Sequence, residues 1–339
     1  MRIGILTAGG DCPGINAAIK AAALTAMREY GATVIGLHDG FKGLLSLDYE
    51  EMSEASVLDF HSIGGTYLGT SREKPYKRLA EDTVSNKSEL LTENISKLGL
   101  NALICIGGNG TMRTVGRMHA DGIPVIGIPK TIDNDVWGTD RTIGFDTATQ
   151  IVADAIDRLR TTASSHHRVM VVEVMGHRAG WLALYGGVAG GADAILLPEL
   201  GECNVSGLME HIQRRAASGL ASSIVVVAEG KLLGGKSHKH LASHIAQTIE
   251  EMSGTDARST VLGYVQRGGT PSSADRVLAT QMGIQAASLA AHGEVGRMVS
   301  LMGAKISAIP LAAVAGNYKP LPTDHELISR ARMMGIYLG

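Results

Sequence analysis

The sequence predicts an α/β protein with two three-layer domains and largely parallel sheets. Its 339 residues are too many for one ordinary core and suit two domains. The chain also repeats one pattern, in which a β-branched apolar run is followed by a small or polar turn and then by a helical stretch. The runs are continuous rather than alternating, which is typical of strands buried on both faces of a parallel sheet. We therefore expect both domains to be Rossmann-like.

The individual elements follow from these runs. Strands are expected at residues 3–7, 102–106, 124–128, 169–174, 194–197, 224–227 and 260–265. Residues 15–30 and 147–160 are predicted to be helical. In the second helix, Ile151, Ile156 and Leu159 share one stripe, and Asp154 and Asp157 lie mostly off it.

Composition excludes several classes of protein. Apolar residues make up 45% of the chain and charged residues 19%, which is typical of a globular protein. The net charge of -2 leaves no electrostatic footprint for nucleic acid. The three cysteines have no metal-ligand spacing, as expected in a reducing compartment. No apolar stretch approaches the roughly 18 residues of a membrane helix, so we expect a cytoplasmic protein with no nucleic-acid or membrane partner.

Two glycine-rich turns follow predicted strands, at Gly9-Gly10-Asp11 and at residues 107–111 (GGNGT). Ligands of open α/β sheets bind at the carboxyl ends of the strands. Glycines let main-chain N–H groups approach a phosphate, and the N-terminus of the next helix favours negative charge. Either turn alone is more often a plain strand-to-helix connection. Two in one chain favour phosphate binding, although neither has the Walker pattern.

Polar residues in a third turn suggest phosphoryl transfer. Asp133 and Asp135 alternate in the segment TIDND, which is either a turn stabilised by Asp and Asn side chains or a catalytic pair. In the catalytic interpretation one carboxylate accepts a proton from a substrate hydroxyl and the other handles a cation. The phosphate cradle just upstream favours catalysis. Four arginines near strand ends or glycine turns are either solvated or suited to forked phosphate binding, namely Arg72, Arg168, Arg258 and Arg267.

Taken together, the motifs resemble the phosphofructokinase family over essentially the whole chain. They are LTAGGDCPGINAAI (6–19), GGTYLGTSR (64–72), GGNGT (107–111), PKTIDND (129–135), TIGFDTA (142–148), EVMGHRAGWLAL (173–184) and LGYVQRGGTPSSADR (262–276). This family transfers a phosphoryl group to the 1-hydroxyl of fructose 6-phosphate. The resemblance implies a donor-binding domain from residues 1–144 plus about 266–306. It implies a sugar-phosphate domain from residues 145–265 plus about 307–339.

The resemblance also implies roles for individual residues. Asp133 would be the general base, with Thr131, Asp135 and Gly176 also in the catalytic set. The donor would be held by Gly10, Arg72, Glu73, Gly108, Asn109, Gly110, Thr111 and Lys130. The sugar phosphate would contact Thr131, Asp133, Arg168, Met175, Gly176, His177, Glu229, Arg258, Tyr264 and Arg267. Arg168 and Arg258 match positions lent by a neighbouring subunit, which implies a homodimer or homotetramer.

Magnesium would be held by Asn109 and Asp135. Asn109 replaces the acid usually found in the family, and its amide oxygen can meet magnesium but contributes no charge.

The donor is ambiguous between ATP and pyrophosphate. Gly110 resembles the ATP type, in which the missing side chain leaves room for the α-phosphate. Lys130 resembles the pyrophosphate type, in which the lysine holds the donor as a point charge, although it is otherwise a solvated loop lysine. A side chain that clashes with a donor excludes it, whereas a lysine only attracts one, so Gly110 has more weight than Lys130. We therefore expect an ATP-dependent 6-phosphofructokinase of glycolysis.

His177 stands where the family usually has an arginine. Together with Asn109, it leaves two other interpretations open, a kinase of another sugar phosphate such as sedoheptulose 7-phosphate and a weakly active regulatory paralogue.

Overall fold

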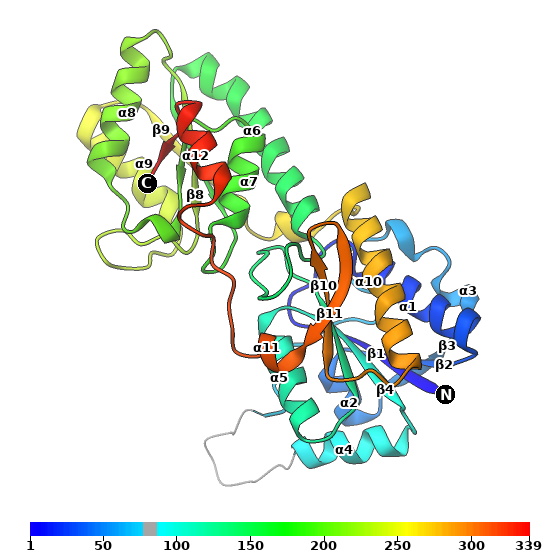
Figure 1. Ribbon diagram of the computed structural model, residues 1–339. Helices are drawn as coiled ribbons and strands as arrows, with labels where there is room; N and C mark the ends of the chain where they lie inside the picture. The colour runs from blue at the N-terminus through cyan, green and yellow to red at the C-terminus, as the bar shows by residue number, and fades with distance from the viewer. Residues whose placement is uncertain (77–86) are drawn as a thin grey trace. The chain divides into compact units, whose positions relative to one another are not determined.

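The computed structural model describes residues 1–76 and 87–339, which form two compact units (Figure 1). Unit 1 comprises Met1–Thr131, Val136–Gly144 and Arg267–Tyr318. Unit 2 comprises Ile132–Asp135, Phe145–Gln266 and Lys319–Gly339. The last crossing between units therefore follows Tyr318 and does not lie near residue 306, because the hairpin β10–β11 completes the first sheet. The predicted α/β class with largely parallel sheets is confirmed.

Unit 1 is built on a seven-stranded sheet in the order β11-β10-β5-β4-β1-β2-β3. Its central strands are parallel, and β3 and β11 add to the two edges as antiparallel strands. The strands are β1 (Arg2–Ala8), β2 (Thr33–Leu37), β3 (Tyr49–Met52), β4 (Ala102–Gly107), β5 (Val125–Pro129), β10 (Arg297–Met302) and β11 (Lys305–Pro310). The helices are α1 (Ile15–Tyr30), α2 (Phe41–Ser46), α3 (Glu54–Val57), η1 (Phe60–Ser62), α4 (Lys87–Lys97), α5 (Asn109–Ala120), α10 (Ser273–Ala291) and α11 (Leu311–Val314).

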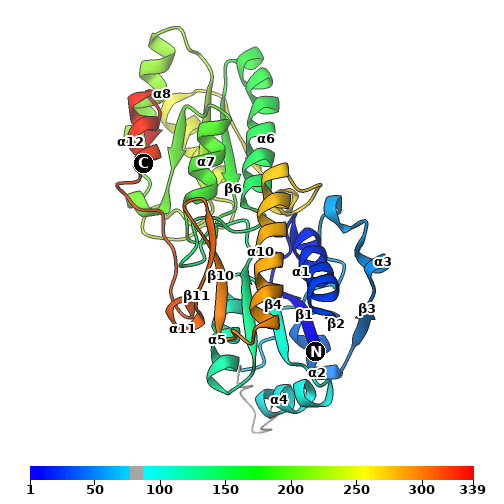
Figure 2. The ribbon, with the colours of Figure 1, turned by 45° about the vertical axis from the view of Figure 1, so that its right-hand side comes forward.

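Helices cover both faces of this sheet. Apolar residues of α4, α5 and α11 form one core with the strands, whereas α10 packs against α1 and against β4 and β5 (Figure 2). The pair α1 and α10 approaches closely at Gly283. A Cβ there would lie 2.6 Å from the main-chain oxygen of Ala18, so the contact depends on glycine.

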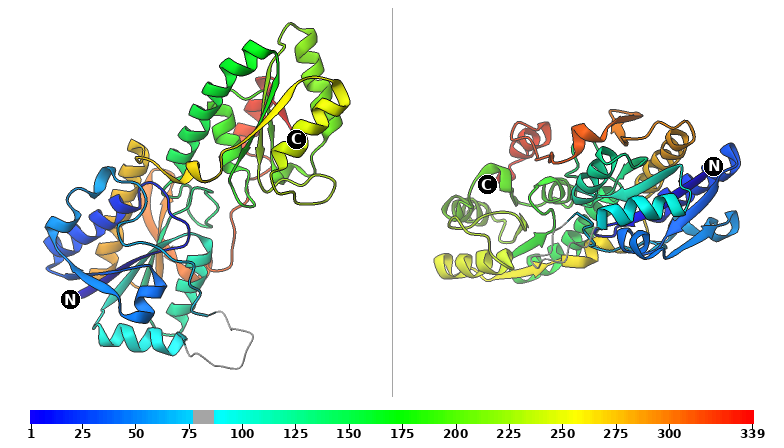
Figure 3. Two further views of the ribbon diagram at one scale, coloured as in Figure 1. Left: turned by 180° about the vertical axis from the view of Figure 1, so that it is seen from behind. Right: turned by 90° about the horizontal axis from the view of Figure 1, so that it is seen from below.

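Unit 2 contains a five-stranded, wholly parallel sheet in the order β12-β7-β8-β6-β9. The strands are β6 (Val169–Val174), β7 (Ala194–Leu196), β8 (Ser223–Ala228), β9 (Ala257–Val261) and β12 (Tyr337–Leu338). The helices are α6 (Phe145–His166), α7 (Trp181–Ala189), η2 (Pro198–Leu200), α8 (Val205–Ala217), α9 (Leu241–Ser253), η3 (Gly263–Arg267) and α12 (Glu326–Met333). Helices α8 and α9 share a core with one face of the sheet (Figure 3). Helices α6 and α7 pack against β8 and belong to the other layer.

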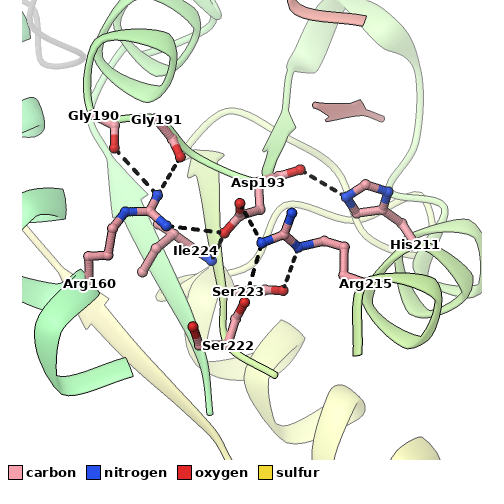
Figure 4. A network of polar contacts seen from close by, with 9 residues as sticks. All are labelled: Arg160, Gly190, Gly191, Asp193, His211, Arg215, Ser222, Ser223 and Ile224. Atoms are coloured by element: carbon pink, nitrogen blue, oxygen red, sulfur yellow. Dashed lines mark hydrogen bonds and ion pairs between the residues drawn. The ribbon is translucent and has the colours of Figure 1, made fainter. Parts of the chain in front are cut away.

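A largely buried carboxylate ties the helices of unit 2 to its sheet (Figure 4). The side chain of Asp193, just before β7, forms ion pairs with Arg215 of α8 at 2.7 Å and with Arg160 of α6 at 3.7 Å. It also accepts a hydrogen bond from the main-chain N–H of Ile224 at 2.8 Å. Because the partners come from both helical layers and from β8, Asp193 stabilises the packing of the whole unit.

One predicted strand is wrong in position. The run at 260–265 was expected to be a strand, but β9 ends at Val261 and residues Gly263–Arg267 form the 3₁₀ helix η3. Gly263 has φ 54°, a left-handed conformation that ends an extended strand. Tyr264 is consequently 76% exposed.

Within residues 1–76 and 87–339, we find no helix long and apolar enough to cross a membrane.

Candidate active site

The glycine turns of unit 1 lie together because β1, β4 and β5 are neighbouring parallel strands. The hydroxyl of Thr111 donates to the main-chain oxygen of Ala8 at 3.3 Å, which joins the turn after β4 to β1. The segment that precedes Arg72 is also hydrogen-bonded to the turn after β1, since the main-chain N–H of Gly9 donates to the main-chain oxygen of Ser71 at 3.1 Å. Arg72 is exposed and, as the residue after Ser71, lies next to the segment that is hydrogen-bonded to the turn after β1.

The turn after β4 has the features of a phosphate cradle. Helix α5 begins at Asn109 with Gly108 as its N-cap, and its first turn contains no acidic residue. The free N–H groups and partial positive charge of a helix N-terminus favour an anion. A Cβ at Gly110 would meet no atom within 4 Å, so the turn leaves room for a phosphate group. These residues fit the donor phosphates of a nucleotide.

Lys130 is buried, and the alternative of a solvated loop lysine is wrong. The residue is only 1% exposed. Its Nζ donates to the main-chain oxygen of Ala8 at 3.1 Å and to that of Gly10. Its ammonium group thus stabilises the turn after β1. The next residue, Thr131, is fixed by Thr142, whose hydroxyl donates to Thr131 O at 2.6 Å.

Arg267 and Glu73, which the sequence predicts to contact bound ligands, both have protein partners within unit 1. Arg267 Nη1 donates to the main-chain oxygen of Asp11 at 3.3 Å, and a Cβ at Gly10 would lie 2.7 Å from that nitrogen. The guanidinium group therefore lies against the first glycine turn, which explains why Gly10 has no side chain. Glu73, expected at the donor, forms an ion pair with Lys87 at 2.8 Å.

Unit 2 holds the carboxylates of the TIDND segment. Asp133 is 8% exposed and Asp135 is 5% exposed. Asn134 between them has φ 51°, so the two aspartates flank a left-handed turn residue. The main-chain oxygen of Asp135 accepts a hydrogen bond from Lys319 N–H at 2.9 Å. Buried carboxylates in an irregular turn are typical of functional sites.

Glu229 and the segment after β6 meet at the carboxyl end of the second sheet. Glu229 Oε1 accepts a hydrogen bond from the main-chain N–H of His177 at 2.8 Å. Burial raises the pKa of Glu229, the His177 hydrogen bond lowers it, and the charge of Asp133 raises it further. The effect of the Asp133 charge on the pKa of Glu229 indicates that the two carboxylates lie near each other in unit 2. Met175 N–H donates to Gln266 Oε1 at 3.2 Å, which brings the end of η3 to the same edge.

Arg168 and Arg258 lie at the opposite end of this sheet. Arg168 immediately precedes β6, whereas Met175 follows it, and Arg258 pairs with Met170 near the start of β6. At about 3.3 Å per residue, the strand separates Arg168 from Met175 by roughly 20 Å. A single unit 2 therefore does not bring these arginines to the residues at the carboxyl edge.

Both arginines contact an acid that the sequence analysis missed. Arg168 Nη2 lies 3.1 Å from Asp256 Oδ2, and Arg258 Nη1 lies 2.6 Å from Asp256 Oδ1. The only sequence signal was an acid two positions before Arg258, which alone does not predict a contact with Arg168.

Magnesium fits the chemistry of the expected ligands. In the described part of the chain, no group of three His, Cys, Asp or Glu side chains is placed to hold a metal ion. Magnesium, however, is usually held by one or two carboxylates together with substrate phosphates and water. Asp135 offers a carboxylate and Asn109 an amide oxygen, and both are oxygen ligands of the kind that magnesium takes.

The fold and the site thus define a two-unit α/β protein equipped for phosphoryl transfer. The phosphofructokinase family profile matches residues 2–290. The chain belongs to the phosphofructokinase family.

The chain is 52% identical over 339 residues to ATP-dependent 6-phosphofructokinase 3 of Bacteroides thetaiotaomicron, covering all of both chains. It is 43% identical to the pyrophosphate–fructose 6-phosphate 1-phosphotransferase of Dictyoglomus thermophilum, covering 97% of each. Among solved structures, phosphofructokinase from Saccharomyces cerevisiae superimposes with a TM-score of 0.82 at 31% identity. That match covers 93% of this chain and 45% of the yeast chain.

Proposed function

We propose that this protein is an ATP-dependent 6-phosphofructokinase that acts in cytoplasmic glycolysis. It transfers a phosphoryl group from ATP to the 1-hydroxyl of fructose 6-phosphate and so produces fructose 1,6-bisphosphate. The observation that carries the proposal is the buried Asp133, which lies in the electrostatic range of Glu229 at the carboxyl edge of a parallel sheet. The full-length similarity to a relative named for this activity supports it.

The chain's own groups supply a direct mechanism. Asp133 accepts the proton of the 1-hydroxyl as that oxygen attacks the γ-phosphorus of ATP, the bond from the γ-phosphorus to the bridging oxygen breaks, and ADP leaves. Glu229 orients the sugar by accepting hydrogen bonds from the sugar hydroxyls. The N–H groups at the N-terminus of α5 hold the phosphates of the donor. Magnesium, held by Asp135 and Asn109, would neutralise phosphate charge when bound. Thr131 and Gly176 complete the proposed catalytic set.

Further contacts follow from the same proposal. The donor is held by Gly10, Arg72, Glu73, Gly108, Asn109, Gly110, Thr111 and Lys130. The sugar phosphate is held by Met175, His177, Tyr264 and Arg267, with Arg168 and Arg258 from a second copy of the chain. The separation of Arg168 from Met175 by the length of β6 supports a homo-oligomer with shared sites.

ATP is the preferred donor because of Gly110 and Lys130 together. The position of a Cβ at Gly110 faces open space, which suits an α-phosphate. The ammonium group of Lys130 donates to main-chain oxygens and so has a structural use that does not require pyrophosphate.

Pyrophosphate is the second candidate donor. The same ammonium group lies in the turn after β1, close to Gly10, where its positive charge attracts a small dianionic donor. The similarity to a relative named for pyrophosphate use supports this alternative.

A donor assay tests the proposal. Purified protein with fructose 6-phosphate and magnesium is given ATP or pyrophosphate separately, and fructose 1,6-bisphosphate is followed. Turnover with ATP alone is expected, and turnover with pyrophosphate alone would replace ATP by the second candidate. Silence with both donors, followed by turnover with sedoheptulose 7-phosphate, would change the substrate. Silence with every sugar would favour a regulatory subunit.

A further inference from the structure

A cluster of four charged residues, the amino-end cluster, lies at the amino ends of β6 and β9. It consists of Arg168, Glu250, Asp256 and Arg258. Asp256 stands between the two arginines, 3.1 Å from Arg168 Nη2 through one carboxylate oxygen and 2.6 Å from Arg258 Nη1 through the other. The parallel register of β6 and β9, with Val169 opposite Ala257, brings Arg168 together with Asp256 and Arg258.

The two acids of the cluster have different tasks. Glu250 accepts hydrogen bonds from Arg258 Nη1 at 2.6 Å and from the main-chain N–H of Ala257 at 3.2 Å, so it shapes the chain between α9 and β9. The carboxylate of Asp256 faces the two guanidinium groups. Asp256 is therefore the acid whose side chain is matched to the arginine pair.

A carboxylate between two guanidinium groups presents two oxygens in the way that a phosphate monoester does. Asp256 pairs with both guanidinium groups, whereas Glu250 pairs with Arg258. The side chains of Arg168, Asp256 and Arg258 are 22%, 36% and 52% exposed, so solvent reaches part of each, although Arg168 Nε and Asp256 Oδ1 are buried. Ion pairs this exposed are weak, and a dianion with more charge and more acceptors competes with them well.

We propose that Asp256 is an internal stand-in for the phosphate of the sugar substrate. It keeps Arg168 and Arg258 paired and aligned until the phosphate displaces it. Asp256 is a positioning residue, because it acts through the arginines. The inference rests on the proposed function, in which these arginines serve the sugar phosphate in the assembled enzyme.

The test compares Asp256→Asn with the wild type in the full-length enzyme. Removing the competing charge should lower the KM for fructose 6-phosphate by about two- to fivefold, the scale of exposed ion pairs. The kcat should change much less. Inorganic phosphate, used as a probe, should raise the Tm of the variant at lower concentration than that of the wild type, at constant ionic strength. Asp256→Glu, which keeps the charge, should behave as the wild type.

Glu326→Gln is the matched control, since it removes an exposed ion pair with Arg330 elsewhere in the same unit. It should change neither KM nor the phosphate response. An unchanged or raised KM in Asp256→Asn, with an unchanged phosphate response, would overturn the inference.

Arg168→Ala separates this failure from failure of the proposed function. A raised KM in Arg168→Ala with no effect of Asp256→Asn would leave the arginine assignment intact and reject the stand-in. No effect of Arg168→Ala on KM or on the phosphate response would reject both. The thermal response to phosphate needs no turnover, so it is informative even if the sugar is another one.

Discussion

At the scale of single residues, the proposed base is Asp133, a carboxylate that the fold buries. Asp133→Asn keeps the shape of the side chain and removes the base. Because a positioned base contributes about 10²–10⁴-fold, we expect kcat to fall by that factor. The Tm should change little, and magnesium-dependent binding of ATP should persist. Steady-state kinetics with calorimetry checks this, and full activity in a folded variant would remove Asp133 from the mechanism.

The raised pKa of Glu229 predicts a pH-dependent contribution to stability. Burial raises this pKa above its ordinary value of 4.5, so the folded protein holds the proton more tightly than the unfolded chain does. The stabilisation is present below about pH 4 and is lost as the pH rises through the folded pKa. Glu229→Gln does not titrate, so the Tm of the variant minus that of the wild type should increase from about pH 4 to pH 8. A difference that is flat or that falls with pH would contradict the stated environment of Glu229.

Gly110 predicts a switch of donor without loss of the fold. A Cβ there meets no atom within 4 Å, so Gly110→Asp should fold. Its bulk and negative charge would oppose an α-phosphate, and like charges in contact cost several kcal/mol, so the KM for ATP should rise by at least roughly tenfold. Gly110→Ala is the control for added volume without charge. An unaltered KM for ATP in Gly110→Asp would show that the bound donor does not lie against this residue.

The residue scale also shows what sequence reasoning can reach. Motifs singled out Asp133, Glu229 and the glycine turns as candidates, because strand ends and turn chemistry are local properties. They did not reveal Asp256, because its contact with Arg168 depends on the register of β6 and β9. The burial of Lys130 depends equally on tertiary structure, since its partners are in the turn after β1.

At the scale of elements, several buried parallel strands were predictable from continuous apolar runs, but β2 and β10, which are also parallel and largely buried, were not. The runs that became β1, β4 and β6 are continuous and apolar, and helix α1 occupies the predicted range. The edge strands β3 and β11 are short or partly exposed, so they carry no continuous apolar run. Apolar residues extended the prediction for β9 too far, because the positive φ of Gly263 decides where that strand ends.

The contact between α1 and α10 predicts a specific loss of stability. A Cβ at Gly283 would lie 2.6 Å from Ala18 O and 2.9 Å from Ala22 N, which are main-chain atoms that cannot rotate away. Gly283→Ala should therefore lower stability by about 1–3 kcal/mol. The same change at Gly110, also in a helix but facing open space, should be neutral or stabilising. Calorimetric Tm values of both variants check the argument, and equal effects would refute the packing explanation.

At the scale of the whole molecule, the position of the arginines supports the proposed second copy of the chain. Strand β6 separates Arg168 from Met175 by roughly 20 Å, so under the proposed function one chain would supply only part of the phosphate site.

Shared sites predict that two impaired variants restore each other. Asp133→Asn lacks the base, so it should be nearly inactive alone. Arg168→Ala lacks a phosphate contact, so its KM should be raised and its activity low at low concentrations of fructose 6-phosphate, where the mixture is assayed. A mixed oligomer can form a site with Asp133 from one chain and Arg168 from the other, and co-expression should therefore recover activity. Asp133→Asn mixed with Asp135→Asn is the control, because both residues lie in one short segment of unit 2 and no mixed site can contain both. Differently tagged chains confirm that mixed oligomers form. If they form and activity stays absent, Arg168 acts within its own chain, and the roughly 20 Å along β6 would have to be spanned by another arrangement of unit 2.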